Sequence, residues 1–371
     1  MKKFEKKCKI RLALLAGAAV FATGAAAGGA VARAETFDPS LHGLVLFELE
    51  DDWAYESDDE DSEVNTVTAT IEPYFILSLT EGFAIETQLV FEQVEDPEAG
   101  EDTEFDNHGL YVESILASYT GDNFRVFAGK FGPTFGTAWD LAPGVYGTDF
   151  AEDYELSEKI GFGASYTLDG GEAGSHTLTA NTFFADTTFL SGSTLHGRGD
   201  LEEEDGGISN TEDFSSYSVT LDSESVAGIE GLNTHLGYRS QSEGDADVDL
   251  DRETGYVVGA NYTFPICDNV DATALVEWAG IRDSEGGDDD VDYYTGGLSF
   301  ALYDNWNVAL SHTSRNTDVQ GGDDVDDHIS QVSVGYAFDN GITLDVGYNH
   351  VEESDVGTDT VGALLGYVFE F

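Results

Sequence analysis

Carboxylates are the residues with the greatest potential for chemistry in this chain, because 73 Asp and Glu stand against only 15 Lys and Arg. Several of them occur in short runs that a divalent cation could bind, at residues 58–61, 202–205, 286–290 and 321–327. None of these runs has the ligand spacing of an EF-hand loop or of a nonapeptide calcium repeat. We therefore predict a solvated acidic surface with no cofactor and no resident metal. Weak divalent-cation binding at the acidic loops is the alternative.

Residues suited to nucleophilic or acid–base catalysis are present but scattered. Hydrolysis needs a nucleophile, a base and an orienting acid within hydrogen-bonding reach of one another. The sequence contains neither G-x-S-x-G nor H-E-x-x-H. The histidines on segments that could carry a base are far apart in sequence: His108, His176, His196, His235, His312, His328 and His350. We predict that the protein is not an enzyme.

The first 34 residues have the pattern of an export signal. Residues 1–11 are basic, residues 12–22 are apolar, and residues 32–34 read Ala-Arg-Ala, which fits a small-x-small cleavage site. An uncleaved transmembrane helix is the alternative, and the Ala/Gly-rich stretch at 22–30 disfavours it. We expect a cleaved signal peptide at 1–34 and a mature, exported protein at 35–371.

The charge of the mature chain is almost entirely negative. Cleavage after Ala34 removes seven of the 15 basic residues and one of the 73 acidic residues, so 8 basic and 72 acidic residues remain. Such a surface repels phosphate backbones, so nucleic acid is excluded as a partner. The imbalance also suits a high-salt habitat, where screening reduces the repulsion among the carboxylates.

The mature chain is organised as segments of about ten residues in which apolar and polar residues alternate. In the last segment, Val361, Leu365 and Phe369 share one face, and a period of two places Gly362 and Glu370 on the other. No segment has 18 consecutive apolar residues, so no membrane-spanning helix is predicted. The predicted strands are 42–53, 64–78, 83–94, 108–119, 124–132, 159–168, 176–186, 214–222, 232–242, 254–264, 270–282, 292–303, 306–317, 328–338, 342–351 and 359–371. We predict an all-β fold, an up-and-down antiparallel transmembrane β-barrel of about 16 strands.

The connections between these segments alternate between short and long. Long acidic connections are predicted at 54–63, 95–107, 133–158, 187–213, 243–253, 283–291, 318–327 and 352–358. A soluble sandwich gives no reason for such alternation, whereas outer-membrane barrels have short periplasmic turns and long outer loops. The long loops are therefore expected outside the cell, and Cys267 in the periplasm. Two segments fit poorly, because Pro73 lies inside a strand and the faces of 108–119 are ambiguous.

In a membrane barrel the apolar face of each strand meets lipid and the polar face lines the lumen. Alternation therefore assigns five acidic side chains to the lumen wall: Glu72, Glu86, Asp271, Glu277 and Asp345. The same parity argument assigns three basic side chains to it: Lys159, Arg239 and Arg315. The lumen is expected to be strongly acidic.

The leader, the sixteen-strand pattern, the terminal G-Y-V-F-E-F and the stretch V-F-A-G-K-F-G-P-T-F-G-T-A-W-D at 126–140 resemble the Gram-negative porin superfamily. In porins the third loop folds into the lumen and narrows it, which here corresponds to the long third loop 133–158. The resemblance thus implies these constriction residues: Trp139, Asp140, Asp149, Glu152, Asp153, Glu155 and Glu158. The fourth loop, 187–213, is as long and remains the alternative. Phe371 resembles the terminal aromatic signal read by the barrel-assembly machinery.

The resemblance implies a passive, water-filled diffusion channel for small hydrophilic solutes and ions. We expect the protein in the bacterial outer membrane, in contact with lipid and lipopolysaccharide. A homotrimer is the expected oligomer. Porins usually place a basic wall patch opposite the acidic loop, and this chain departs from them in having few basic residues. We therefore predict a preference for cations, since anion channels need rings of Arg or Lys. The alternative is a solute-specific, receptor-like or structural barrel without general diffusion activity.

Overall fold

A computed structural model describes residues 39–95, 97–244 and 250–371. The predicted signal peptide, 1–34, lies outside the described residues. No helix among the described residues is long and apolar enough to cross a membrane.

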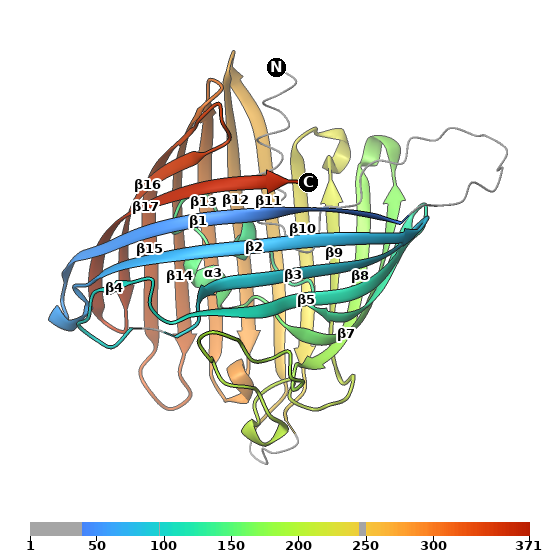
Figure 1. The fold of residues 1–371 in the computed structure, drawn as a ribbon, viewed down its shortest axis with the longest axis horizontal. Coiled ribbons are helices and arrows are strands. Elements are labelled where there is room, and N and C mark those ends of the chain that lie inside the picture. Colours follow the sequence, from blue (N-terminus) through green and yellow to red (C-terminus); the bar gives the residue numbers. More distant parts are fainter. Residues whose placement is uncertain (1–38, 96, 245–249) are drawn as a thin grey trace.

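Sixteen long strands form one closed antiparallel sheet (Figure 1). The first eight are β1 (Ser40–Ser57), β2 (Asn65–Thr80), β3 (Phe83–Gln93), β5 (His108–Thr120), β6 (Phe124–Phe131), β7 (Lys159–Asp169), β8 (Ser175–Ala185) and β9 (Ser216–Glu224). The others are β10 (Leu232–Gln241), β11 (Glu253–Cys267), β12 (Val270–Arg282), β13 (Asp290–Leu302), β14 (Trp306–Asp318), β15 (Val325–Ala337), β16 (Thr343–Glu353) and β17 (Val356–Glu370). The barrel closes because β1 pairs with both β2 and β17. The prediction of a sixteen-stranded barrel is confirmed.

The strands are steeply tilted, as closure of a barrel requires. In Figure 1 the near strands β1, β2, β3 and β5 cross the more distant strands β12 to β14 at a large angle. The remaining strand, β4 (Thr103–Glu104), lies in the second loop and pairs in parallel with β2. Within the described residues, the helical turns lie between wall strands: α2 (Ala138–Leu141), α3 (Asp149–Glu152), η1 (Glu60–Ser62), η2 (Gly171–Ala173), η3 (Glu203–Asp205), η4 (Val226–Gly228) and η5 (Ser284–Gly286).

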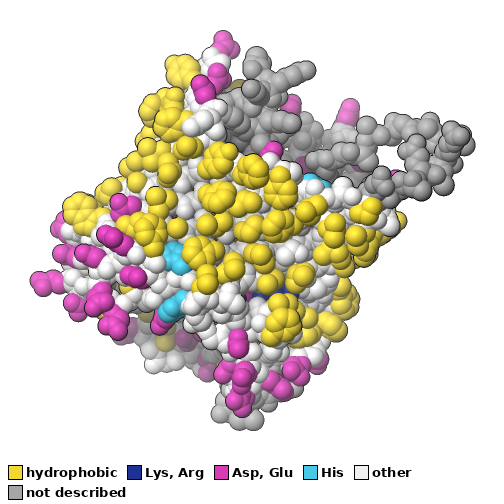
Figure 2. Space-filling model, viewed as in Figure 1, with side chains coloured by type: hydrophobic (Ala, Val, Ile, Leu, Met, Phe, Trp, Pro, Cys, Tyr) yellow, Lys and Arg dark blue, Asp and Glu magenta, His cyan; other side chains and the backbone are white. Residues whose placement is uncertain are grey.

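The two faces of the wall differ as the alternation predicts. Val346 and Leu365 are 48% and 41% exposed on the outside, whereas Asp345, next to Val346, is only 7% exposed and faces inward. Figure 2 shows apolar side chains covering the middle of the visible wall, with many Asp and Glu side chains gathered beyond them. The apolar band is therefore a surface for lipid, and the polar face surrounds the lumen.

One predicted long loop, 352–358, is wrong. β16 ends at Glu353 and β17 begins at Val356, so only Ser354 and Asp355 connect them. Both have left-handed φ, 52° and 64°. Two such residues form the turn whose twist matches that of antiparallel strands, and Asp tolerates this conformation better than most residues. The acidic composition of the segment concealed a tight hairpin.

The two poorly fitting segments have local explanations. Pro73 pairs with Val45 of β1, but the ladder between β2 and β3 has no pairs at residues 72 and 73, as expected where an N–H is missing. In β5, Gln88 of β3 faces Ser114 while Leu89 faces Val112, so Glu113 is an extra residue in a β-bulge. The bulge reverses the parity of the strand, which is why its faces are ambiguous in the sequence.

The two wall faces predict losses of stability of different size when a positive charge is introduced. Val346→Arg places a guanidinium in lipid and should destabilise the barrel by about 2–4 kcal/mol near the bilayer midplane. Asp345→Arg places the same group toward lumen water and should cost less. Equilibrium unfolding by urea in lipid vesicles measures both. A larger loss for Asp345→Arg than for Val346→Arg would contradict the assignment of the two faces.

Candidate functional site

The third loop, residues 132–158 between β6 and β7, lies inside the barrel. It carries α2 and α3, and its apolar side chains join a buried cluster with inward side chains of the wall. The cluster comprises Phe135, Ala138, Ala142, Ala151, Tyr154 and Leu156 of the loop with Phe183, Val257, Leu275, Ala279, Ile281, Val291 and Tyr293 of β8, β11, β12 and β13. These contacts hold the loop against one side of the wall.

Glu277 on β12 is the central polar anchor of the third loop. Its carboxylate accepts hydrogen bonds from the backbone N–H of Thr137 (2.9 Å) and of Ala138 (2.9 Å), and from the hydroxyls of Thr137 (2.7 Å) and Tyr154 (2.8 Å). The side chain is 5% exposed. Glu277, which alternation assigned to the lumen wall, binds the third loop.

Neighbouring strands add two further anchors. His235 Nε2 lies 3.1 Å from the backbone N of Gly136 and accepts its N–H, while Nδ1 of the same ring bonds Asp222 (2.7 Å). Arg239 donates to the backbone oxygen of Tyr154 (2.7 Å) and pairs with Glu253 (2.7 Å). The imidazole of His235 and the guanidinium of Arg239 thus both hold the backbone of the third loop in place.

Arg315 on β14 holds the part of the loop around α3 and Asp153. It forms ion pairs with Asp153 of the loop (2.9 Å) and Asp327 of β15 (2.6 Å), and also contacts Glu353. Its guanidinium lies 4.5 Å from the ring centroid of Phe150. The positive charge of Arg315 is therefore surrounded by carboxylates.

Small residues on the wall give the loop room to approach. A Cβ at Gly297 would lie 2.3 Å from Cδ of Pro143, and one at Gly362 would lie 2.0 Å from the hydroxyl oxygen of Tyr146. That hydroxyl donates to Asp52 of β1. The wall is thus shaped for the loop, since a strand glycine marks close approach of another segment.

The fourth loop, between β8 and β9, meets the C-terminal end of the third. Arg198 of the fourth loop pairs with Glu158 and stacks on Tyr111, with 3.9 Å from its guanidinium to the ring centroid. Lys130 on β6 also pairs with Glu158 (3.0 Å) and with Asp186 (2.9 Å). Glu158 thus joins the two long loops.

Three loop carboxylates, Asp149, Glu152 and Glu155, form no ion pair with any described residue. Desolvation inside the barrel and the charges of Glu152 and Asp52 raise the pKa of Asp149 to about 7. Desolvation and Glu152 likewise raise the pKa of Glu155 to about 7. Glu152 is therefore close enough to repel both Asp149 and Glu155, and this repulsion disfavours their charged forms.

The strands opposite these carboxylates are acidic too. Their inward acids close enough to repel the loop acids are Glu50 and Asp52 of β1, Glu72 of β2, Glu92 of β3 and Glu113 of β5. The third loop and this side of the wall therefore turn acidic side chains toward each other, an arrangement that we call the acidic passage. Alternation placed Glu72 on this face, whereas the bulge concealed the face of Glu113.

The other predicted site residues have individual environments. Trp139 donates through Nε1 to the backbone oxygens of Phe135 (3.1 Å) and Gly136 (3.2 Å), which stabilises the turn before α2. Asp140 is 8% exposed, and desolvation with the charge of Glu155 raises its pKa to about 8. Both lie within the inserted loop.

Along the wall, predicted residues lie at several heights. Glu86 pairs with Arg125 (2.7 Å), Asp345 accepts from Asn307 (3.2 Å), and Asp271 is exposed near a short turn. Lys159 points inward near Arg239, without an ion pair to a described residue. These residues line the lumen but do not meet at the acidic passage.

Most of the eight basic residues after residue 34 form ion pairs with nearby carboxylates. Six form ion pairs with carboxylates: Arg125, Lys130, Arg198, Arg239, Arg282 and Arg315. Arg252 instead bonds Ser240 (3.0 Å) and Ser242 (2.5 Å). No basic side chain among the described residues forms an ion pair with Asp149, Glu152 or Glu155.

The packing of the third loop against the wall can be detected in the sequence, as apolar residues at positions where alternation predicts polar ones. Leu275, Ala279 and Ile281 are apolar yet have the parity of the lumen face of β12. A water-filled lumen gives no reason for apolar side chains there. Their pattern indicates a segment packed against the wall from inside.

The C-terminal residue completes the closure of the barrel. The backbone N and O of Phe371 bond O and N of Gly43, each at 3.1 Å. Its ring lies 5.9 Å from that of Phe75 on β2. Phe371 thus connects the end of β17 to β1 through its backbone and to β2 through its ring.

Comparison with known proteins agrees with this architecture. The family model for the Gram-negative porin matches residues 16–356. The chain is similar in structure to the outer-membrane channel DcaP of Acinetobacter baumannii, with 13% identity, coverage of 90% of this chain and 97% of that one, and a TM-score of 0.54. The chain is also similar in structure to OprB of Pseudomonas putida. The identity is 11%, the match covers 89% of this chain and 94% of that one, and the TM-score is 0.61.

A third similar structure is OmpT of Vibrio cholerae, folded in vitro and described in a trimer form. It shares 11% identity, covers 90% of this chain and 99% of its own, and has a TM-score of 0.50. No curated protein matches the sequence. The low identities show a shared fold, and the family model adds the family. The chain therefore belongs to the Gram-negative porin family and is a channel-forming barrel of the bacterial outer membrane.

Proposed function

We propose that this porin is a passive, water-filled channel that favours cations and admits small hydrophilic solutes. The observation that carries the proposal is the acidic passage. Asp149, Glu152 and Glu155 face the inward acids of β1, β2 and β3, while Arg239 and Arg315 are held in ion pairs. Carboxylates around a narrow passage raise the local concentration of cations and repel anions.

The transport step on this proposal is diffusion without chemistry. Arg239 and Arg315 position the third loop, so they do not provide the basic wall of many porins. A cation exchanges part of its hydration for carboxylate oxygens at the narrowest level and leaves on the other side. Catalysis has no place in this account.

Conductance in a planar lipid bilayer tests the channel itself. The purified, folded barrel should insert as discrete, ohmic steps of a water-filled pore. Heat-denatured protein at the same concentration is the control and should give none. Folded protein that inserts without conducting would contradict the proposal and favour a solute-specific or structural barrel.

The partners of this porin follow from its proposed setting. We propose a homotrimer, in line with the trimer form described for OmpT. The exposed apolar wall suits lipid, the acidic outer loops suit lipopolysaccharide bridged by weakly bound divalent cations, and Phe371 suits the barrel-assembly machinery as an assembly signal. Chemical cross-linking in native membranes should give a trimeric band, and a band of monomer alone would contradict the trimer.

A further inference from the structure

Two histidines and a glutamate meet on the outer face of the wall, away from the lumen. His328 lies on β15, and His350 and Glu352 lie on β16. They share the parity of the lipid-facing Val334 and Val346, and His328 pairs directly with Glu352 across the two strands. All three are within a few residues of the outer ends of their strands, where the wall leaves the apolar band.

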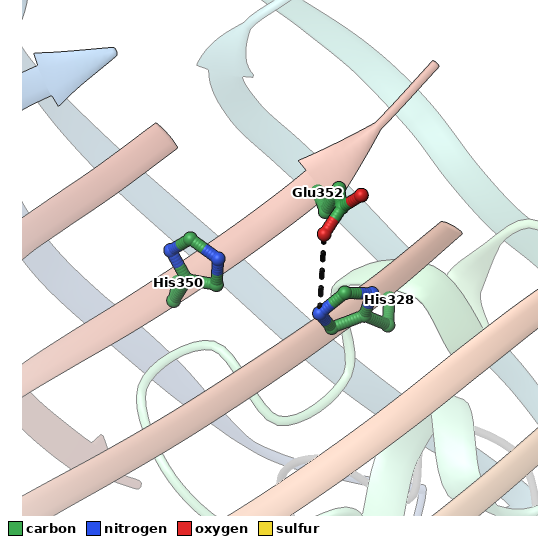
Figure 3. A group of neighbouring side chains, drawn as sticks. All are labelled: His328, His350 and Glu352. Carbon is green, nitrogen blue, oxygen red and sulfur yellow. Dashed lines mark ion pairs between the residues drawn. The ribbon is translucent and has the colours of Figure 1, made fainter. Parts of the chain in front are cut away.

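The three side chains point toward one another (Figure 3). One ligand atom from each lies within 4.8 Å of the other two, and Nε2 of His328 is 3.8 Å from Oε2 of Glu352. Ligand atoms bound tetrahedrally to zinc, at about 2.0–2.1 Å, are roughly 3.3 Å apart. Rotations of these half-exposed side chains would close the difference.

A second carboxylate orients one of the imidazoles. Nδ1 of His350 lies 2.9 Å from Oδ1 of Asp359 on β17, and the hydroxyl of Tyr348 donates to the same oxygen (2.6 Å). A carboxylate bonded to Nδ1 fixes the proton there and leaves Nε2 as a lone-pair donor. This carboxylate–histidine arrangement is the usual support of a metal-binding histidine.

We propose that His328, His350 and Glu352 form a surface site for a transition-metal cation of the zinc class. Two imidazole nitrogens and one carboxylate oxygen suit such a cation better than they suit Mg²⁺ or Ca²⁺, which take oxygen ligands. The three protein ligands leave a fourth position for water or an external donor. The cation would bridge β15 and β16 at the outer rim, and the large negative charge of the protein would concentrate it there.

His312 extends the cluster along the wall. Its ring centroid lies 5.9 Å from that of His328, and its Nδ1 bonds Ser330 Oγ (2.8 Å). It stands on β14, one strand further from Glu352. The site thus lies between the imidazole of His312 and the carboxylate of Asp359, and both groups would stabilise a bound cation.

Metal binding by the purified, metal-depleted barrel in detergent tests the proposal. Titration with Co²⁺, a visible-absorbing substitute for Zn²⁺, is made in a large molar excess of Mg²⁺, which occupies the oxygen-only acidic loops. We expect one equivalent of Co²⁺, a visible band of a low-coordinate complex, and displacement of that band by Zn²⁺. Complete suppression of Co²⁺ binding by Mg²⁺ would overturn the proposal.

Variants separate this site from general acidity. His328→Gln and His350→Gln should each abolish the visible band, and Asp359→Asn should weaken affinity by about 10–100-fold, as expected of a residue that orients a ligand. His176→Gln, on β8 at the short-turn side, is the matched control and should bind as the unmodified protein does. Equal binding by the His328→Gln/His350→Gln double variant would contradict the site. Bilayer conductance of each variant confirms that the barrel is folded.

Discussion

Replacing Glu277 with alanine should release the third loop from the wall and enlarge the channel. The carboxylate accepts four hydrogen bonds from Thr137, Ala138 and Tyr154 in a site that is 5% exposed. Each hydrogen bond to a charged group contributes about 1.5–3 kcal/mol, and truncation leaves the loop donors buried without an acceptor. The loop should therefore lose several kcal/mol of local stability while the barrel ladder remains intact.

Two measurements detect this release. Single-channel conductance should rise, and chymotrypsin should cleave within residues 132–158, which are rich in aromatic residues that the buried cluster now protects. Asp271→Ala is the matched control, because Asp271 lies on the same strand and face but is exposed at the short-turn end. Unchanged conductance and protease resistance in Glu277→Ala would show that Glu277 does not hold the loop.

Removing the three loop carboxylates should abolish most of the cation preference. The combined variant Asp149→Asn, Glu152→Gln and Glu155→Gln takes away charge at the narrow passage and none of the anchoring hydrogen bonds from Glu277, His235 or Arg239. The ratio of K⁺ to Cl⁻ permeability should therefore fall severalfold, and the barrel should stay folded. The ratio is obtained from the reversal potential in a KCl gradient.

A matched variant with the same loss of charge lies at the outer rim. Asp58→Asn, Asp59→Asn and Glu60→Gln remove three carboxylates around η1, away from the passage. Their effect should be much smaller, because salt screens exposed charges beyond about 10 Å at 0.1 M. Equal effects of the two triple variants would place selectivity in the overall charge and not in the third loop.

The same carboxylates should make selectivity depend on pH. The pKa values of Asp149 and Glu155 are raised to about 7, so these groups lose their charge as the pH falls through that value. The cation preference should thus be largest above pH 8 and decrease toward pH 6. The triple variant of the loop should lose this part of the pH dependence.

Much of the barrel could be predicted from the sequence because a period of two is a local property. Alternation along the chain assigns Leu365 and Gly366 to opposite faces of the strand without knowledge of the strands that pair with it. The hairpin at Ser354 and Asp355 and the bulge at Glu113 could not be predicted, since each depends on the pairing of two strands. Composition alone does not distinguish an acidic turn from an acidic loop.

The candidate site could be predicted less well, because it depends on which long-range partners each charge finds. Asp153 and Glu158 belong to the predicted constriction residues, yet they pair with Arg315 and Arg198. Glu277 has the parity of a lumen residue, and only the insertion of the loop makes it an anchor. His328 and His350 are 22 positions apart and meet because β15 and β16 are neighbours.

The reversal potential of the unmodified channel in a KCl gradient is the most direct test of the account. The acidic passage predicts that K⁺ permeates in preference to Cl⁻, and that the preference decreases as the mean salt concentration rises and screening shortens the reach of the carboxylates. A preference for Cl⁻ at low salt would contradict it, as would a K⁺ preference that does not change with salt.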